Sequence, residues 1–493
     1  MSALQNITEK EFFDTQGASE KGHNPAETHP TSQRFEPYYD HESCLPISEH
    51  WSEQLSGFAN ETARTFTIER ATSYVVRCLA TLVPSFLAIH TKTHTPRILK
   101  STAWLDGLRG VAALLVVIHH HSGLWYLPLW RLSPTTASGP WETFFQQPYI
   151  KLFYFAGSFY VAIFFVISGY SLSYRPLTLL RSNQAAKFLD ALSSSAFRRA
   201  FRLFIPPSVV TFVIMLTVQL GWRTPEDPAF TASTFLQNIG MWLYDTAAHF
   251  DVLRAIPTSL EDSARYHSAY NIHLWTIAIE YQGSMAVFLV LLAICKLTTT
   301  TRMAVVSAVI AYGFYFNYLY HVTFIAGILL AEANMIYADS SKTIMSLSSR
   351  TSTILRESCS IGLFISSLAL ALSSPRLERF SAILVVFAIN YSDLLQLLFT
   401  TSFAQYLGRI SFSLYMVHGT IMISFCFWLM PWIGSFIRHT DAIDLDFVVT
   451  TILTSFISFP LTFCVADWFT RFVDEKAVHL AAVIWKKVAV IDN

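Results

Sequence analysis

Long apolar stretches separated by short polar segments dominate the chain from about residue 100 onward. A helix needs roughly 20 mainly apolar residues to cross the hydrocarbon core of a bilayer. Stretches of this length predict about ten membrane-spanning helices, near residues 108–127, 153–173, 203–221, 272–295, 303–320, 322–338, 358–373, 381–399, 410–430 and 447–468. The predicted fold class is therefore all-α, a polytopic bundle of transmembrane helices.

Polar positions divide the rest of the chain. Residues 1–65 are rich in Ser, Thr, Glu, His and Pro and show no sustained period, which predicts a disordered cytosolic tail. Residues 66–103 form a lead-in whose apolar part is interrupted by an arginine and a proline. This pattern favours an amphipathic helix on the membrane surface, with a membrane span as the alternative. The membrane domain is expected at 104–470, followed by a tail at 471–493.

The distribution of charge predicts the orientation in the membrane, because basic residues in short loops mark the cytosolic side. The segment between the second and third predicted spans carries six basic residues and one acid, whereas the loop at about 222–271 carries six acids and three arginines. We therefore place the first segment in the cytosol and the loop in the lumen. The last tail carries four basic residues close to the final span, so both termini are expected to be cytosolic.

Composition supports a membrane protein and narrows the function classes. Hydrophobic residues make up 53% of the chain and charged residues 14%, which suits a polytopic membrane protein better than a soluble one. The formal net charge is zero, so nothing favours nucleic acid as a partner. The six cysteines lie far apart without a C-x-x-C pair. This spacing argues against a zinc site and a disulfide framework, and no metal site is predicted.

The N-terminal sequence bears on targeting. It is polar and acidic, unlike the basic and then apolar pattern of a cleavable signal peptide. We therefore expect the first span to direct insertion into the endoplasmic reticulum or a connected endomembrane.

Titratable residues interrupt the first predicted span, in which Arg109 precedes three consecutive histidines. Such groups are costly inside a membrane and usually face a protein interior or a functional cavity. His120 follows Arg109 by eleven positions, or three helical turns plus about 20°, so both side chains project from one face about 16 Å apart. His119 and His121 project elsewhere, and we expect them to cap the span at the lumenal interface. The same capping is the alternative for His120.

The fourth predicted span carries Glu280 eight residues after its start at residue 272. That places the carboxylate about 12 Å deep, which is similar to the depth of His120 on an oppositely directed helix. Pairing with a carboxylate keeps an imidazole basic and prepares a neutral histidine to act as a general base. We predict that Glu280 orients His120; a purely structural hydrogen bond between helices is the alternative.

Other polar residues of the predicted bundle are candidates for substrate contacts. Arg199 and Arg202 are three residues apart and share a helix face at the cytosolic membrane edge. Guanidinium groups there suit the phosphates of coenzyme A or a lipid headgroup, with a topology signal as the alternative. Tyr170 follows a Ser-Gly pair that allows close helix packing, and we expect it to line a substrate pocket. His418, about 12 to 15 Å deep, is expected to line the same cavity as His120, with a structural role as the alternative.

Five segments of the chain together resemble one protein family. In order, they read "LDGLRGVAALLVVIHH", "FFVISGYSLSY", "RRAFRLFIP", "LWTIAIEYQ" and "ISFSLYMVH". This series resembles the acyltransferase-3 family of integral membrane O-acyltransferases, in the form found in fungi, from about residue 104 to 470. In that family an arginine and a histidine separated by ten residues on the first span are the functional hallmark, and they fall on Arg109 and His120.

The resemblance also implies roles for other residues. The R-x-x-R of the family falls on Arg199 and Arg202, and the acidic residue of its W-S-L-x-x-E segment falls on Glu280. This segment departs from the common form, because it reads "WTIAIEYQGSM" where "WSLSVEEQFY" is usual. The glutamate is kept, but the residues beside it that shape the acceptor pocket differ.

The activity implied by the resemblance is transfer of an acyl group, most often acetyl, from acyl-coenzyme A to a hydroxyl. The expected acceptor is a small lipophilic metabolite that enters from the membrane, as in secondary metabolite biosynthesis. Acyl-coenzyme A is then a cosubstrate, membrane lipid surrounds the enzyme, and no cofactor is expected to stay bound.

Three alternatives remain at this point. The other large class of membrane-bound O-acyltransferases also uses an intramembrane histidine. It fits less well, because its histidine lies late in the chain and is accompanied by an upstream asparagine. A multi-pass transporter that uses Arg109, His120 and Glu280 as a proton or substrate path is the rival from another class; the lack of visible internal repeats counts against it. A catalytically inactive relative that acts as a receptor or scaffold is the third.

Overall fold

The computed structural model describes residues 83–85, 99–125, 144, 147–223, 230, 234–251, 267–344, 350–438 and 445–489. Contacts divide the chain into Met1–Phe66 and Thr67–Asn493, and every described residue belongs to the second unit. The predicted tail at 1–65 and most of the lead-in at 66–103 lie outside the described residues.

All regular secondary structure among these residues is helical, which confirms the predicted all-α fold class. In chain order the main helices are α4 (Ala103–Trp125), α7 (Pro148–Phe155), α8 (Gly157–Arg181), α9 (Ala185–Gln219), α10 (Phe235–His249), α12 (Trp275–Ile294), α13 (Thr299–Tyr315), α14 (Leu319–Ile344), α15 (Arg350–Leu370), α16 (Pro375–Asn390), α17 (Asp393–Thr400), α18 (Ser402–Ile421), α19 (Phe427–Ile437), α20 (Leu445–Phe469) and α21 (Glu475–Val488). A short 3-10 helix, η5 (Ile272–Leu274), precedes α12, and π-helical turns η6 (Met422–Cys426) and η7 (Thr470–Asp474) follow α18 and α20.

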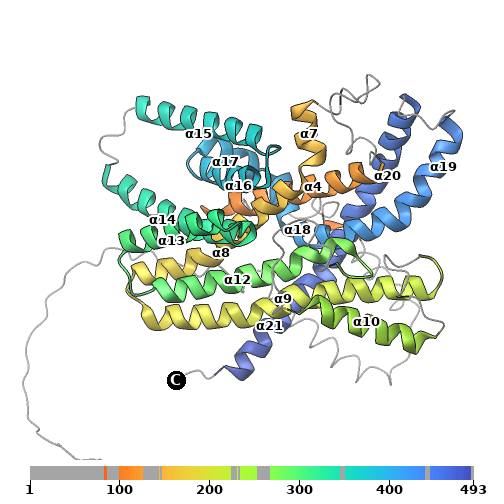
Figure 1. Ribbon diagram of the computed structural model, residues 1–493, viewed down its shortest axis with the longest axis horizontal. Coiled ribbons are helices and arrows are strands. Elements are labelled where there is room, and N and C mark those ends of the chain that lie inside the picture. Colours follow the sequence, from red (N-terminus) through yellow and green to blue (C-terminus); the bar gives the residue numbers. More distant parts are fainter. Residues whose placement is uncertain are drawn as a thin grey trace, which may run out of the picture. The chain divides into compact units, whose positions relative to one another are not determined.

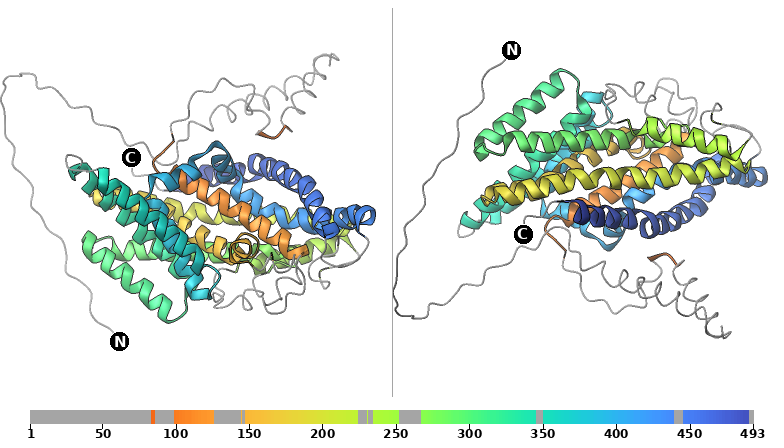
Figure 2. Two further views of the ribbon diagram at one scale, coloured as in Figure 1. Left: turned by 90° about the horizontal axis from the view of Figure 1, so that it is seen from above. Right: turned by 90° about the horizontal axis from the view of Figure 1, so that it is seen from below.

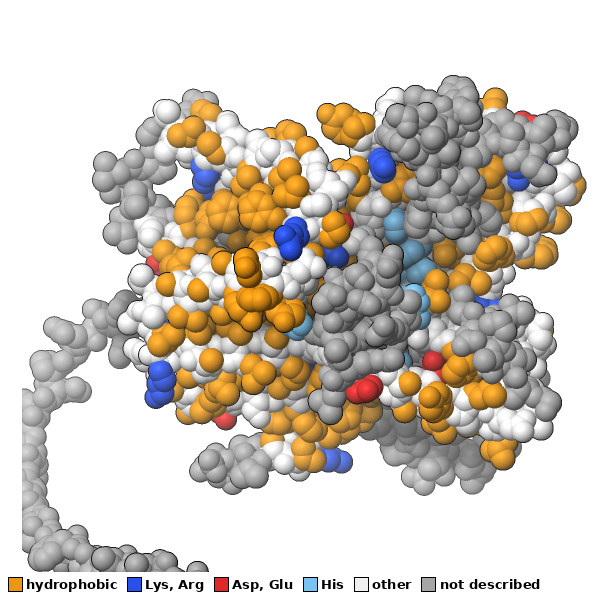
Figure 3. Space-filling view, viewed as in Figure 1, with side chains coloured by type: hydrophobic (Ala, Val, Ile, Leu, Met, Phe, Trp, Pro, Cys, Tyr) orange, Lys and Arg blue, Asp and Glu red, His pale blue; other side chains and the backbone are white. Residues whose placement is uncertain are grey.

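Eight helical segments in the described part of the chain are long and apolar enough to cross a membrane, and a ninth is obtained if α16 and α17 count as one bent span. Hydrophobic side chains cover much of the described part of the molecular face drawn in Figure 3, as expected of a surface in contact with lipid. Trp428, Trp432, Phe436 and Phe456, for example, are all more than half exposed. The chain is therefore a multi-pass membrane protein.

The predicted count of about ten spans is not confirmed, although a helix lies at each of the ten predicted positions. The stretch at 303–320 falls in α13, which has 17 residues and ends before Asn317 in the left-handed conformation, with φ of 64°. The stretch at 381–399 is divided between α16 and α17, which meet at an angle of 98°. Ser392 begins α17 as its N-cap by accepting a hydrogen bond from the backbone of Leu395. The orientation of the termini stays a prediction.

Helix α8 occupies the core of the bundle and packs against α4, α9, α12, α14 and α16. Figures 1 and 2 show α4, α8, α9 and α12 side by side with axes in a similar direction. The closest approach is to α14, where a β-carbon built on Gly169 would lie 1.9 Å from the carbonyl oxygen of Phe324. The close helix packing predicted for the Ser-Gly pair is therefore present, because only a glycine allows the two backbones to touch.

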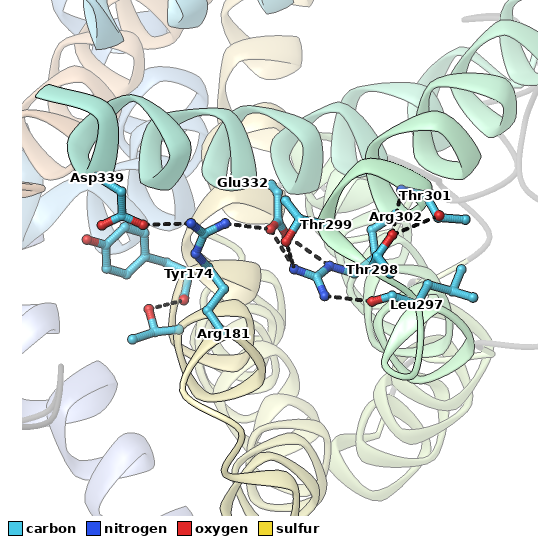
Figure 4. A network of polar contacts seen from close by, with 10 residues as sticks. Tyr174, Arg181, Leu297, Thr298, Thr299, Thr301, Arg302, Glu332 and Asp339 are labelled. Carbon is cyan, nitrogen blue, oxygen red and sulfur yellow. Dashed lines mark hydrogen bonds and ion pairs between the residues drawn. The ribbon is translucent and has the colours of Figure 1, made fainter. Parts of the chain in front are cut away.

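A buried ionic network joins α8, α13 and α14 (Figure 4). The carboxylate of Glu332 binds Arg181 of α8 at 3.1 Å and Arg302 of α13 at 2.6 Å. Arg181 also binds Asp339 at 2.6 Å. Glu332 is 4% exposed, so its carboxylate is shielded from water while it neutralises the two guanidinium groups. The network therefore ties α8 to the consecutive helices α13 and α14, which lie more than 100 residues later in the chain.

Replacing Glu332 with glutamine is expected to lower the free energy of unfolding by about 3–5 kcal/mol, because it removes the carboxylate that neutralises the buried Arg302 guanidinium, whereas Arg181 keeps Asp339. Thermal unfolding in detergent measures the effect. Asp339→Asn is the matched control, since Asp339 is 57% exposed and exposed ion pairs contribute at most about 1 kcal/mol. Equal losses in the two variants would contradict a special role for Glu332.

Candidate active site

Three histidines from three helical segments meet inside the bundle. His120 comes from α4, His273 from η5 and His418 from α18, and their nearest ring nitrogens all lie within 4.8 Å of one another. Nδ1 of His120 lies 3.0 Å from Nε2 of His418, within hydrogen-bond distance. The His273 ring packs on the His120 ring with 4.2 Å between centroids. The group therefore combines the predicted His120 of the first span with His418 and with His273, which was not predicted from the sequence.

Close contact between α4 and α18 brings His120 to His418. A β-carbon built on Gly110 would lie 2.2 Å from the backbone nitrogen of Gly408, and one built on Gly408 would lie 2.4 Å from the carbonyl oxygen of Asp106. Backbones this close require glycine on both helices. The two helices are therefore held near contact distance about three turns from the histidines.

Replacing Gly110 with alanine is expected to destabilise the protein by about 1–3 kcal/mol, because the added methyl group overpacks the contact between α4 and α18. Gly240→Ala on α10 is the control. A β-carbon there meets no atom within 4 Å, so the higher helix propensity of alanine is expected to stabilise. The thermal unfolding midpoints in detergent should therefore shift in opposite directions, and a rise for Gly110→Ala would contradict the packing argument.

The three histidines differ in their surroundings. His418 is 1% exposed, and its Nδ1 lies 2.7 Å from the carbonyl oxygen of Tyr415 and 3.2 Å from that of Leu414. His273 is 5% exposed, and its Nε2 is buried without a hydrogen-bond partner among the described residues. His120 is only partly buried. Of the three, His120 is therefore the most accessible to a substrate.

The neighbouring histidines of α4 lie outside this group. Nδ1 of His119 lies 3.2 Å from the carbonyl oxygen of Tyr154. His121 is 4% exposed, and its Nε2 lies 3.0 Å from the hydroxyl of Ser458. His121 therefore packs against α20 inside the protein, and of the three consecutive histidines His120 is the one that meets His418.

Glu280 does not pair with His120 as predicted. Its carboxylate binds the guanidinium of Arg199 at 2.7 Å, and Arg199 also donates to the hydroxyls of Ser168 and Ser284 at 2.8 and 3.0 Å. The physical reason is depth along the helix. Glu280 follows His273 by seven residues, so it lies on a similar face about 10 Å further along, while His273 occupies the level of His120.

Arg109 lies on the side of α4 that faces α18, as does His120. Its guanidinium donates to the hydroxyl of Ser411 at 3.0 Å and to the carbonyl of Gly408 at 3.1 Å, and it binds Asp106 at 3.1 Å. The side chain is 32% exposed. Arg109 is therefore held in place while part of its charge remains open to a ligand.

The remaining predicted residues are not brought to the histidines. Arg202 lies on α9, where its charge acts on the carboxylate of Asp474 together with that of Arg109. Tyr170 is completely buried, and its hydroxyl is bound by Asn334 at 2.7 Å and by Asn390 at 3.2 Å. This geometry places Tyr170 in the core around α8 rather than at a pocket wall, so its predicted lining role finds no support.

His273 is the residue that sequence reasoning missed. It stands in "NIHLWTIAIE", at the start of the fourth predicted span, and a helical repeat of seven residues links it to Glu280. That repeat was a usable signal, since two titratable residues shared one face of an apolar helix. The three histidines also form the group in the described part of the chain that could hold a metal ion, and three histidines are the ligand set of some catalytic zinc sites. The prediction that no metal binds stays untested.

Comparison with known proteins assigns the chain to a family. A family model described as "Acyltransferase domain" matches residues 102–471. The chain is 31% identical to O-acetyltransferase PaAT-1 of Phomopsis amygdali over 83% of its own length and 89% of that protein. It is 24% identical to Acyltransferase R4 of a Phoma species, over 68% of this chain and 86% of that one. It is also 24% identical to Acyltransferase clz18 of Cochliobolus lunatus, over 79% and 97%. No solved structure matches. The chain therefore belongs to the acyltransferase-3 family and is a multi-pass membrane acyltransferase.

Proposed function

We propose that this protein transfers an acetyl group from acetyl-coenzyme A to a hydroxyl of a small lipophilic metabolite, in the endoplasmic reticulum or a connected endomembrane. The observation that carries the proposal is the hydrogen bond between His120 and His418 in a chain of this family. A partly accessible histidine with a fixed partner is a suitable general base. The name O-acetyltransferase, given to a relative that is similar over most of its length, supports acetyl as the acyl group.

His120 acts as the general base in this proposal. It takes the proton from the acceptor hydroxyl while the oxygen attacks the carbonyl carbon of the thioester. The new C–O bond forms, the C–S bond breaks, and the proton passes from His120 to the coenzyme A thiolate that leaves. The products are the acetyl ester and coenzyme A. All atoms, charges and protons balance without a further reactant.

Arginines bind the donor in this proposal. Arg109 stands three turns, or about 16 Å, from His120 and is 32% exposed. A guanidinium at that distance suits the phosphates of a long donor whose thioester reaches the histidine. Arg202 contributes a second positive charge, which acts on the carboxylate of Asp474 as the charge of Arg109 does. Arg199 of α9 binds Glu280 of α12 and the hydroxyl of Ser168 of α8, so we propose that it holds these three helices together.

The acceptor enters through the bilayer in this proposal. The family match covers 102–471, so the membrane domain makes up most of the chain. This arrangement favours an acceptor that partitions into lipid over a soluble glycan, and it fits a step in secondary metabolite biosynthesis.

Labelled acetyl-coenzyme A tests the proposal. Microsomes that contain the protein are incubated with the labelled donor and a lipophilic metabolite extract, and the products are separated by mass. We expect acceptors that gain one acetyl group and equimolar release of coenzyme A. A transporter would redistribute a solute across sealed vesicles without forming a labelled ester, so that outcome would exclude the proposal. Longer acyl-coenzyme A donors in parallel reactions define the chain length.

A further inference from the structure

The backbone of α18 determines which nitrogen of His418 carries a proton. Nδ1 of His418 lies 2.7 Å from the carbonyl oxygen of Tyr415 and 3.2 Å from that of Leu414. A carbonyl oxygen only accepts hydrogen bonds, so Nδ1 must donate and therefore bears the proton. In neutral His418, Nε2 is then left with a lone pair.

The tautomer of His418 determines the tautomer of His120. Nε2 of His418 lies 3.0 Å from Nδ1 of His120. Since Nε2 of His418 is the acceptor, Nδ1 of His120 is the donor and carries the hydrogen. Neutral His120 therefore has its lone pair on Nε2, the ring nitrogen that does not contact His418. That is the nitrogen able to take a proton from a substrate.

We propose that His418 is a positioning residue for acyl transfer, which fixes the tautomer and orientation of His120 so that its Nε2 is presented as the base. The inference rests on the proposed function of His120. His418 would do in this site what a buried carboxylate does in a hydrolase triad, where the group behind the histidine holds the reactive tautomer. His418 differs from such a carboxylate because it is neutral in this arrangement: its Nδ1–H donates to a backbone carbonyl, and its Nε2 accepts from His120.

The surroundings of His418 suit a rigid support. The residue is 1% exposed, and Tyr415, whose carbonyl binds it, donates its hydroxyl to the carbonyl of His273 at 2.6 Å. The same hydroxyl accepts a hydrogen bond from Thr276 at 2.8 Å. One turn of α18 therefore anchors His418 and the segment that bears His273. The π-helical turn Met422–Cys426 begins four residues later, and such turns are frequent at functional sites.

His273 completes the support. Its ring lies 4.2 Å from that of His120 and 4.9 Å from that of His418, measured between centroids. A β-carbon built on Gly419 would lie 2.1 Å from Cδ2 of His273. Glycine directly after His418 thus makes room for the third imidazole, and the three rings limit one another's rotation.

Three variants test the inference with the full-length protein in detergent. His418→Leu removes the acceptor for Nδ1–H of His120, and we expect kcat to fall about 100-fold, near the lower end of the contribution of a general base. KM for acetyl-coenzyme A should stay within about twofold, because the donor arginines are unchanged. His418→Gln, whose side-chain oxygen accepts at a position similar to Nε2, should regain about tenfold of that loss. His121→Leu is the control, with an unrelated buried imidazole, and is expected to keep kcat.

The outcomes separate this inference from its rivals. Equal losses of kcat in His418→Leu and His418→Gln, with KM rising in parallel, would assign His418 a packing role and overturn it. Unchanged kcat in His418→Leu would do the same. Zinc at one equivalent per purified chain, lost in His418→Leu, would replace positioning by metal ligation. Wild-type protein without acetyl transfer would overturn the proposed function itself, whereas each of the other results requires an active wild type.

Discussion

His120→Ala is expected to lower the turnover of acetyl transfer by a factor of about 10² to 10⁴, the usual contribution of a general base. The variant keeps Arg109 and its contacts with α18, so donor binding should persist and the loss should appear in kcat. The measurement is the rate of coenzyme A release by purified protein, together with the yield of acetylated acceptor.

His479→Ala is a suitable control for this experiment, because His479 is an exposed histidine of α21. Both variants should elute from size-exclusion chromatography as the wild type does. Normal turnover in a His120→Ala protein that accumulates normally would show that His120 is not the base. His418 would then have no reactive neighbour to position.

Glu280→Gln is expected to cost about 3–5 kcal/mol of folding free energy, because it leaves the Arg199 guanidinium uncompensated between helices. The Arg199 side chain is 11% exposed and that of Glu280 is 22% exposed, so water compensates little of the lost attraction. The double variant Arg199→Gln/Glu280→Gln removes both charges and should regain most of the stability. Thermal unfolding in detergent provides the comparison.

The ion pair between Arg409 and Glu475 is the matched control for that experiment. It has a similar distance, 2.9 Å, but its side chains are 45% and 41% exposed, so Glu475→Gln should cost at most about 1 kcal/mol. A stable and active double variant would show that Glu280 serves structure alone. Acetyl transfer that stays lost after stability returns would instead assign the pair a part in the reaction.

Helix positions were predictable because the bilayer imposes a simple rule on composition. A spanning segment must satisfy its backbone internally and expose apolar side chains, so α4, α8 and α20 were visible as long apolar runs. The count was not predictable to the same degree. Whether α16 continues into α17 depends on the cap at Ser392, and a side chain on another helix, Glu357, accepts hydrogen bonds from Ser392 and from the backbone of Asp393.

The candidate base was also accessible from the sequence, but its partner was not. The period of the helix aligns His120 with Arg109, and both contact α18 in the structure. Predicting the partner required the relative depth of two helices far apart in sequence. An error of about two turns, roughly 10 Å, was enough to select Glu280 in place of His273.

Three features could be read from the sequence alone: the helical class, the family, and the alignment of Arg109 with His120. Each of these depends on local composition, on the pitch of one helix or on an ordered set of motifs. The pairing of Glu280 with Arg199, and the placing of His418 and His273 around His120, follow from the packing of the helices. Those contacts arise from the depth and rotation of separate helices, which close packing at glycines such as Gly110 and Gly408 sets and which no single segment encodes.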